Sequence, residues 1–284
     1  MSVSSHAFTQ VDVFSDRGFA GNPLAVVHDA TGISTERMLE ITSWTNLSET
    51  AFLLPASDPR ADYRVRIFCP GRELPFAGHP TLGACAAWLA AGGRAQDSER
   101  IVQECGAGLV PIGRTGDRLA FAAPPLVRSG PIDDVVLDER LRLLGLTRSD
   151  VVDAAWIDNG PGWMGLLLDS AEAVLDVALP TAPFLGFDVG LIGFHSPGSE
   201  CAIEVRGLFA DASGSIREDP VTGSLNASAA QWLIAGGRIS APYVAKQGTV
   251  IGRSGRVHVS ADDHGLWIGG DCSVTISGTI DVHR

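Results

Sequence analysis

Two stretches of the sequence, 144 positions apart, repeat one pattern. Residues 77–93 read AGHPTLGACAAWLAAGG and residues 219–237 read DPVTGSLNASAAQWLIAGG, with a tryptophan, a leucine and a Gly-Gly pair at matching places. Each copy follows a strand-like segment, YRVRIFCP at 63–70 and AIEVRGLFA at 202–210. The repeated unit is therefore a strand, a turn that contains glycine, and an apolar helix. Such a duplication predicts two domains of similar fold.

The length of the chain also favours two domains, because 284 residues exceed the usual size of a single hydrophobic core. The 33 glycines and 16 prolines supply many turns, which favours a strand-heavy fold over a helical bundle. The segment 123–133, APPLVRSGPID, has the composition of a linker. We therefore predict an N-terminal domain at 1–124 and a C-terminal domain at 125–274.

Charge and composition exclude some classes of partner. A net charge of −12 disfavours nucleic acid and anionic membrane surfaces. No apolar run approaches the length of a membrane span, and the N-terminus lacks the pattern of a signal peptide. The five cysteines are scattered and odd in number, which favours reduced thiols. We therefore expect a cytoplasmic protein with no nucleic-acid or membrane partner.

Several elements outside the repeat can be predicted locally. Residues 11–14 and 24–27 read as two strands joined by a hairpin connection. Ser34 is suited to cap a helix that runs to about Trp44. A further helix is expected over 137–145.

The first candidate for chemistry is His79, in the turn that opens the first repeated helix. Pro80 suits the first helical position, and the backbone N–H groups that follow could hold an anion. Histidine titrates near neutral pH and can therefore move protons. The alternative is that His79 only caps or hydrogen-bonds the turn.

The second candidate is Asp219, in the matching turn of the other copy. Thr222, Gly223 and Ser224 can present hydroxyl and N–H donors at the start of the second helix. Two such helix starts that faced each other would form a positive cradle for a substrate carboxylate. The alternative is that Asp219 is simply the N-cap of its helix.

The third candidate is Glu49, which follows the first helix. A carboxylate enclosed by Leu47, Ala51 and Phe52 could shuttle a proton. The alternative is a solvated acidic residue in a loop.

No cofactor or metal motif accompanies these residues. GxGxxG does not follow a strand, and no Walker, GxSxG or HExxH pattern occurs. The remaining histidines lack the spacing of metal ligands. We expect no metal and no cofactor.

Six motifs follow one another along nearly the whole chain: QVDVFSDRGFAGNPLAVV (10–27), NLSET (46–50), RELPFAGHPTLGA (72–84), QECGAG (103–108), EDPVTGS (218–224) and KQGTVIGR (246–253). In this order they resemble the PhzF family, a phenazine-biosynthesis isomerase-like group in the diaminopimelate epimerase superfamily. This resemblance implies an α+β fold of two pseudo-symmetric domains, each a curved, mostly antiparallel sheet wrapped around a central helix. It also implies an active site between the domains, a homodimer, and a last strand, about 275–284, that rejoins the first domain.

The resemblance also implies roles for single residues. Glu49 matches the family's acid/base that moves a proton between substrate carbons. His79 and Asp219 match residues that handle protons or orient the substrate. The positions that match groups binding the substrate carboxylate are Gly78, Gly223 and Ser224.

The implied activity is that of a cofactor-independent isomerase of the trans-2,3-dihydro-3-hydroxyanthranilate type, acting on a small carboxylate-bearing metabolite. Epimerases and racemases of the superfamily use two cysteines at the helix starts, where this chain has Gly78-His79 and Asp219. Two alternatives stay open. One is an epimerase, racemase or dehydratase acting on an amino or hydroxy acid. The other is a catalytically silent homologue that binds a small molecule.

Overall fold

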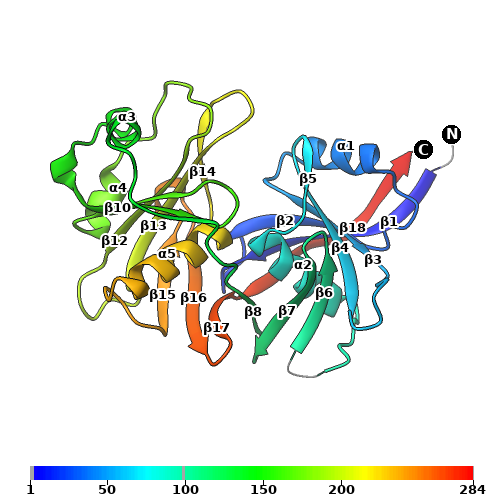
Figure 1. Cartoon of the computed structure of the whole chain (residues 1–284). Helices are drawn as coiled ribbons and strands as arrows, with labels where there is room; N and C mark the ends of the chain where they lie inside the picture. The colour runs from blue at the N-terminus through cyan, green and yellow to red at the C-terminus, as the bar shows by residue number, and fades with distance from the viewer. Residues whose placement is uncertain (1–2, 98–99, 284) are drawn as a thin grey trace. The chain divides into compact units, whose positions relative to one another are not determined.

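The computed structural model describes residues 3–97 and 100–283, which divide into two compact units (Figure 1). Unit 1 comprises Met1–Ala122 and Gly269–Arg284, and unit 2 comprises Ala123–Ile268. The return to unit 1 thus begins at Gly269 rather than at about 275. The reason is that the last strand starts at Cys272 and pairs along its length with the first strand of the chain.

Unit 1 is built mainly of strands, with two helices between them. Its elements are β1 (Val3–Val13), β2 (Asn22–Val27), α1 (Thr35–Thr45), β3 (Thr50–Leu54), β4 (Tyr63–Cys69), β5 (Arg72–Leu74), α2 (Gly78–Ala90), β6 (Arg100–Cys105), β7 (Gly108–Thr115), β8 (Arg118–Ala122) and β18 (Cys272–His283).

Unit 2 adds a comparable set of strands and helices. Its elements are β9 (Arg128–Gly130), α3 (Asp134–Leu144), a 3-10 turn (Arg148–Asp150), β10 (Val151–Asp158), β11 (Met164–Leu168), α4 (Ala171–Asp176), β12 (Asp188–Phe194), β13 (Ile203–Ala210), β14 (Ile216–Asp219), α5 (Gly223–Ala235), β15 (Tyr243–Gln247), a second 3-10 turn (Thr249–Ile251) and β16 (Gly255–Asp262). The strand β17 (Gly265–Gly270) spans the boundary back to unit 1.

The two units repeat one order of strand pairing. In unit 1 the pairs β1–β2, β3–β4, β4–β5 and β6–β7 are antiparallel, whereas β2–β3 and β4–β6 are parallel. In unit 2 the pairs β10–β11, β12–β13, β13–β14 and β15–β16 are antiparallel, whereas β11–β12 and β13–β15 are parallel. Each of the first seven strands of unit 1 therefore has a counterpart in unit 2. The chain has the α+β fold that the family resemblance implies.

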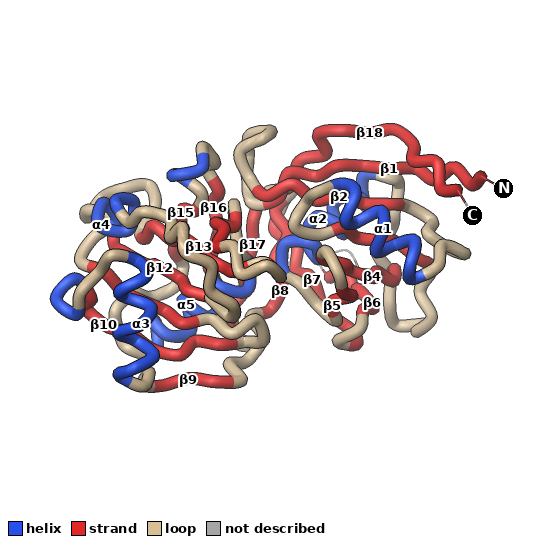
Figure 2. Tube along the Cα trace, turned by 90° about the horizontal axis from the view of Figure 1, so that it is seen from above, coloured by secondary structure: helices blue, strands red, loops and turns tan. Residues whose placement is uncertain are grey.

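The long strands β1 and β18 lie side by side near the two chain ends, as Figure 2 shows. The hairpin expected between 11–14 and 24–27 is confirmed as the antiparallel pair β1–β2. The helix expected after Ser34 is also confirmed, since the Ser34 side chain accepts a hydrogen bond from the N–H of Arg37.

The central helices α2 and α5 are apolar on nearly all sides, as expected of helices enclosed by a sheet. In unit 1, α2 packs against β1, β2, β3, β8 and β18. A glycine permits the closest approach: a Cβ on Gly83 would come within 2.6 Å of Leu24 and 2.9 Å of Val13. The repeated apolar segments are thus the helices around which the strands of each unit are arranged.

Two local expectations need correction. The segment 123–133 is not only a linker, because Arg128–Gly130 forms β9 and pairs with β10. Pro80 is the third residue of α2 rather than the first, since the helix begins at Gly78. Proline is tolerated there because none of the first N–H groups of a helix has a partner within it.

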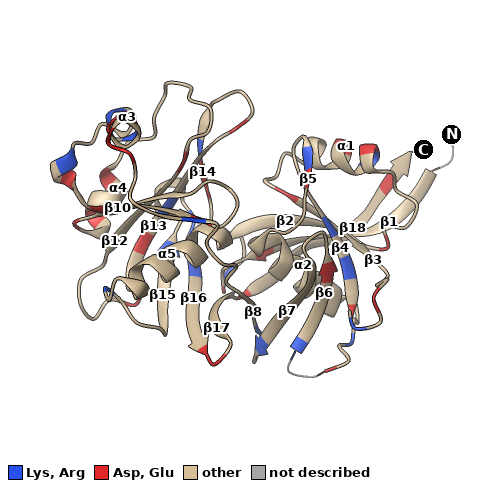
Figure 3. Ribbon diagram, viewed as in Figure 1, with Lys and Arg blue, Asp and Glu red and all other residues tan. Residues whose placement is uncertain are grey.

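Acidic and basic side chains are interspersed over both units (Figure 3). Among the residues that the structure describes, no helix combines the length and apolar character that a membrane crossing requires.

Candidate active site

Glu49 lies in the short connection between α1 and β3 of unit 1. The helix ends at Asn46, which adopts the left-handed conformation (φ 57°) and turns the chain toward β3. The side chain of Glu49 is only 19% exposed, and its Oε2 lies 3.5 Å from Nδ1 of His79. The solvated loop residue considered from the sequence is therefore not what the structure shows.

His79 is the second residue of α2, and its side chain is almost completely buried. The N-cap residue of this helix is Ala77, which makes no side-chain capping bond. His79 is therefore not a cap. Its Nε2 is buried and has no hydrogen-bond partner in the part of the chain that the structure describes. A buried polar atom of this kind is costly unless a ligand or water satisfies it.

Burial lowers the pKa of His79 to about 3, with a backbone hydrogen bond to Pro23 opposing the shift. The imidazole is therefore neutral near pH 7, because desolvation disfavours its charged form. The contact with Glu49 consequently joins a carboxylate to a neutral ring and is not an ion pair. A neutral imidazole can donate a hydrogen bond from one nitrogen and accept one at the other.

The first residue of β2, Asn22, places a third polar group beside the ring. Nδ2 of Asn22 lies 3.5 Å from Nδ1 of His79. The loop just before Asn22 is held by Asp12, whose buried carboxylate accepts hydrogen bonds from the N–H groups of Ala20 and Gly21. Asp12 thus fixes the chain next to the residue that contacts the histidine.

In unit 2, Asp219 is the last residue of β14, three positions before Thr222 and four before the first residue of α5. Its Oδ2 accepts a 2.6 Å hydrogen bond from the hydroxyl of Thr222. Thr222 is the N-cap residue of α5, and its side chain makes no capping bond. The alternative that Asp219 caps this helix is therefore wrong. The Thr222 side chain leaves the first N–H groups of α5 uncapped, and N–H groups at a helix start can bind an anion.

Ser224, in the first turn of α5, is held from the loop that follows β10. Nε1 of Trp163 donates to the Ser224 hydroxyl at 3.0 Å, and Nδ2 of Asn159 donates to the Ser224 carbonyl at 2.9 Å. The indole leaves the serine hydroxyl free to donate its own proton. Trp163 is buried, so the orientation of Ser224 is set by packed neighbours.

Gln247 organises the same helix start, although the sequence analysis did not single it out. Its Oε1 accepts from the Thr222 N–H and from Nδ2 of Asn226. Its Nε2 donates to the Thr222 hydroxyl and to the Asp219 carbonyl. The signal that could have found it is its spacing, because Gln247 follows Gln103 by the same 144 positions that separate Trp88 and Trp232.

Each unit thus contains some of the site residues predicted from the sequence. In unit 1, Glu49 approaches His79, which follows Gly78 at the start of α2. In unit 2, Asp219 bonds the N-cap of the helix that begins with Gly223 and Ser224. Within residues 3–97 and 100–283, no group of three or more His, Cys, Asp or Glu side chains is placed to hold a metal ion.

The arrangement of elements and the polar groups at the two helix starts define an epimerase-like α+β protein. The chain belongs to the phenazine biosynthesis-like (PhzC-PhzF) family, which it matches over residues 11–280.

Several related proteins match this chain over almost its whole length. The protein is 33% identical to antisense-enhancing sequence 1 of Schizosaccharomyces pombe, over 97% of this chain and 99% of the relative. It is 31% identical to an uncharacterized isomerase of Pasteurella multocida, over 94% and 91%. It is 29% identical to trans-2,3-dihydro-3-hydroxyanthranilate isomerase of Pseudomonas fluorescens, over 90% and 91%. The family and these names support an enzyme of the isomerase class.

Solved structures share the fold. A predicted epimerase from Pseudomonas aeruginosa superposes with a TM-score of 0.78 at 27% identity, covering 97% of this chain and 99% of that one. A hydroxyproline epimerase from Agrobacterium vitis has a TM-score of 0.56 at 15% identity, covering 98% and 93%, and shows the likeness of the fold alone.

Proposed function

We propose that the protein is an isomerase that moves a proton between two carbons of a small carboxylate-bearing metabolite, without a cofactor. The observation that carries the proposal is the contact of Glu49 with the buried, neutral His79. The family, and the relative named trans-2,3-dihydro-3-hydroxyanthranilate isomerase, support a hydroxylated cyclic carboxylate as the class of substrate.

Glu49 is the proposed acid/base. Its carboxylate would remove a proton from one carbon and return it to another, so that one group serves both half-reactions. The neutral ring of His79 lies beside this carboxylate without adding a positive charge. The carboxylate therefore keeps the capacity to accept a proton from carbon.

His79 is proposed to hold a polar group of the substrate. Its Nε2 has no protein partner among the described residues and would be satisfied by a substrate hydroxyl or amino group. Because the ring is neutral, it could pass a proton as well as bind. Asn22, 3.5 Å from Nδ1, would favour one tautomer over the other.

The start of α5 is proposed to bind the substrate carboxylate. The N–H groups of Gly223 and Ser224 and the hydroxyl of Ser224 are the donors, aided by the helix dipole. Gly78 would contribute in the same way at the start of α2. Asp219 is proposed to orient or protonate the bound substrate through its side chain, which the Thr222 hydroxyl holds in place.

The test is turnover in D₂O, followed by NMR. The enzyme is incubated with trans-2,3-dihydro-3-hydroxyanthranilate and with a panel of small amino and hydroxy acids. We expect a constitutional isomer that carries solvent deuterium at the carbon receiving the proton. Deuterium incorporation without constitutional change would instead assign an epimerase or racemase. Binding without any turnover would assign a silent binding protein.

Glu49→Gln tests the assigned base directly. We expect turnover to fall by at least about 10²-fold, the lower end of what general acid–base catalysis supplies. Ligand binding and thermal stability should be retained, because glutamine preserves the size of the side chain. Undiminished turnover of Glu49→Gln would remove Glu49 from the mechanism. The cytoplasmic compartment and the homodimer stay predictions, which cell fractionation and light scattering would check.

A further inference from the structure

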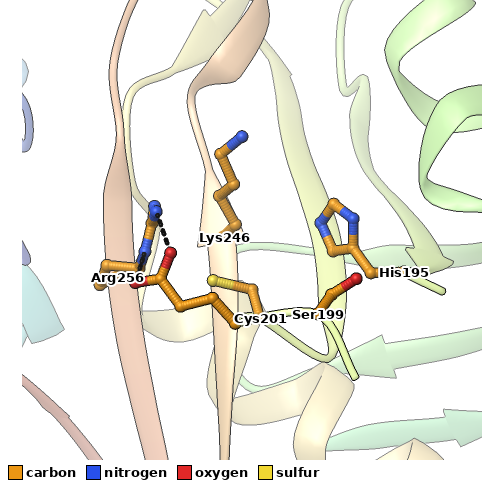
Figure 4. A pocket seen from close by; sticks show the side chains of 6 residues that line it. His195, Ser199, Cys201, Lys246 and Arg256 are labelled. Atoms are coloured by element: carbon orange, nitrogen blue, oxygen red, sulfur yellow. Dashed lines mark hydrogen bonds and ion pairs between the residues drawn. The ribbon is translucent and has the colours of Figure 1, made fainter. Parts of the chain in front are cut away.

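A pocket of about 180 Å³ lies in unit 2, outside the candidate active site. Figure 4 shows its lining side chains, with Lys246 between Arg256 and His195. We call it the outer pocket, and it is lined by His195, Ser199, Glu200, Cys201, Lys246 and Arg256.

The outer pocket lies on the face of the sheet that turns away from α5. Along β15 the side chains alternate between the two faces, as in any strand. Gln247 bonds the start of α5, so its neighbour Lys246 points to the opposite face. Likewise a Cβ on Gly255 of β16 would meet Val221, just before α5, so Gly255 faces the helix. The next residue, Arg256, therefore lies on the outer face. A ligand in this pocket is therefore separated from the α5 helix start by the sheet itself.

Two positive charges stand directly opposite each other in the outer pocket. Lys246 and Arg256 are paired residues of the antiparallel strands β15 and β16. Like charges at such a pair are destabilising unless an anion lies near them. The Lys246 and Arg256 side chains are only 26% and 18% exposed, so solvent does not screen them fully. This arrangement favours an anionic group.

The fixed anion nearby is Glu204, which is completely buried. Its Oε2 lies 3.1 Å from Nε2 of His195 and 4.0 Å from Nζ of Lys246, and its Oε1 accepts from the hydroxyl of Thr249 at 2.5 Å. Glu204 is thus enclosed by donors and holds Lys246 and His195 at the pocket.

Arg256 is instead matched by Glu200, which lies at the surface. The Nε and Nη2 atoms of Arg256 contact the two carboxylate oxygens of Glu200 at 3.4 and 3.2 Å. The Glu200 side chain is 79% exposed, so water competes for its carboxylate although Arg256 itself is only 18% exposed. The Glu200 carboxylate therefore marks a two-point anion position on Arg256 that a more highly charged ligand could take.

We propose that the outer pocket binds a phosphate group, either as inorganic phosphate or as a small phosphate monoester, in place of the Glu200 carboxylate. A phosphate monoester carries roughly −1.5 to −2 charges and several acceptor oxygens, so it can engage both Arg256 and Lys246. The Ser199 hydroxyl and the His195 ring supply further polar groups. The volume of about 180 Å³ equals roughly six waters at ~30 Å³ each, enough for phosphate. It is below the roughly 300 Å³ at which pockets for drug-sized ligands begin.

The experiment is a titration of the full-length protein with inorganic phosphate and with glycerol phosphate, at constant ionic strength, by calorimetry and by NMR of the His195 ring. We expect saturable binding to one site. The ligand that binds more tightly shows whether the pocket prefers inorganic phosphate or a phosphate monoester. Arg256→Gln and Lys246→Gln should each weaken binding by about tenfold or more, the loss expected for one charge-assisted hydrogen bond. Glu200→Gln should tighten binding several-fold, because it removes the competing carboxylate.

The matched controls are Arg217→Gln, which removes an exposed arginine of unit 2 ion-paired with Asp211, and Ser224→Ala, which alters the start of α5. Both should leave phosphate affinity unchanged. The opposite effects of Glu200→Gln and Arg256→Gln keep the test informative if the lysine variant fails to fold. The proposal is overturned if neither the parent protein nor Glu200→Gln shows saturable binding. It is also overturned if Ser224→Ala abolishes binding while Arg256→Gln does not.

Discussion

Gln103 and Gln247 occupy matching places in the two units, 144 positions apart, and make matching hydrogen bonds. Each side chain is completely buried in a strand beside its central helix. Nε2 of Gln103 donates to the hydroxyl of Thr81 at 3.0 Å, and Nε2 of Gln247 donates to the hydroxyl of Thr222 at 2.9 Å. A buried amide therefore ties the start of the central helix to the neighbouring sheet in both units.

The two glutamines differ in the number of their side-chain hydrogen bonds, so their removal should destabilise the protein to different extents. Gln103 makes two side-chain hydrogen bonds, to Tyr63 and Thr81, whereas Gln247 makes four. At roughly 1 kcal/mol per bond, Gln103→Leu should cost about 2 kcal/mol and Gln247→Leu about 4 kcal/mol. The unsatisfied partners left behind would add to both values.

Thermal unfolding of the two matched variants checks this order. We expect the midpoint of Gln247→Leu to fall further than that of Gln103→Leu. Equal or reversed shifts would show that the network at α5 does not stabilise unit 2 as described.

The buried ring of His79 predicts a loss of stability in acid. Its pKa is about 3 in the folded protein, against 6.5 for a free histidine side chain. Below pH 6.5 the unfolded chain binds a proton that the folded protein excludes, so the free energy of unfolding falls as the pH falls. This contribution has a slope of about 1.4 kcal/mol per pH unit and ends near pH 3.

His79→Gln should remove that slope, and His264→Gln, at an exposed position, serves as the matched control. The measurement is urea unfolding at several pH values between 4 and 7, roughly the range in which the folded and unfolded states differ in protonation. NMR should also show the ring of His79 unprotonated down to about pH 4. A ring that titrates near pH 6.5 would contradict the neutral histidine on which the proposed mechanism depends.

The sequence predicted the duplication, the central helices and the family because these depend on local patterns. The apolar helix, the preceding strand and the Gly-Gly ending recur at one spacing. Because the helix consists mostly of apolar residues, its burial can be expected from the sequence. The N-cap Ser34 is likewise visible in the sequence, since capping uses neighbouring residues.

The polar network at α5 could not be predicted in the same way. Trp163 and Gln247 reach Ser224 and Thr222 across 61 and 25 residues of chain, through contacts that only the folded sheet creates. The roles of Asp219 as partner of a threonine hydroxyl, and of Thr222 as N-cap, also depend on where β14 ends. Local propensity alone favoured the aspartate as the cap.

The β1–β2 loop predicts a sharp contrast between two glycines. A Cβ on Gly21 would lie 2.1 Å from the backbone oxygen of Val13, whereas one on Gly18 would come no closer than 3.9 Å to Thr275. Gly21→Ala must therefore displace the backbone next to Asn22, and we expect a loss of about 1–3 kcal/mol, typical of overpacking. Gly18→Ala should be nearly neutral. Thermal unfolding and turnover of both variants test this, and a tolerated Gly21→Ala would show that the loop can shift.

The buried pair of Arg206 and Glu218 predicts a strong coupling. Their side chains are 1% and 2% exposed, and Nη1 of Arg206 also donates to the carbonyl groups of Val174 and Val177. Arg206→Met leaves a buried carboxylate without its partner and should cost about 3–5 kcal/mol. The double variant Arg206→Met/Glu218→Leu should recover part of that loss. A double variant less stable than Arg206→Met would show that the carboxylate stabilises β14 without the arginine.

The last prediction concerns the hydrogen bond from Trp163 to Ser224, which orients the serine hydroxyl at the start of α5. Trp163→Phe removes the Nε1 donor but keeps an aromatic ring in the buried site. If Ser224 donates to the substrate carboxylate, KM should rise by about fivefold to tenfold, as expected for roughly 1 kcal/mol of lost orientation, while kcat changes little. Ser224→Ala should raise KM by at least as much.

The double variant Trp163→Phe/Ser224→Ala separates orientation from simple damage to the fold. Because the indole acts through the serine, its loss should have no further effect on KM once the hydroxyl is gone. Additive effects in the double variant would mean that Trp163 supports the site through packing rather than through Ser224. A rise in KM for Trp163→Phe together with an unchanged KM for Ser224→Ala would remove Ser224 from the set of substrate-binding residues.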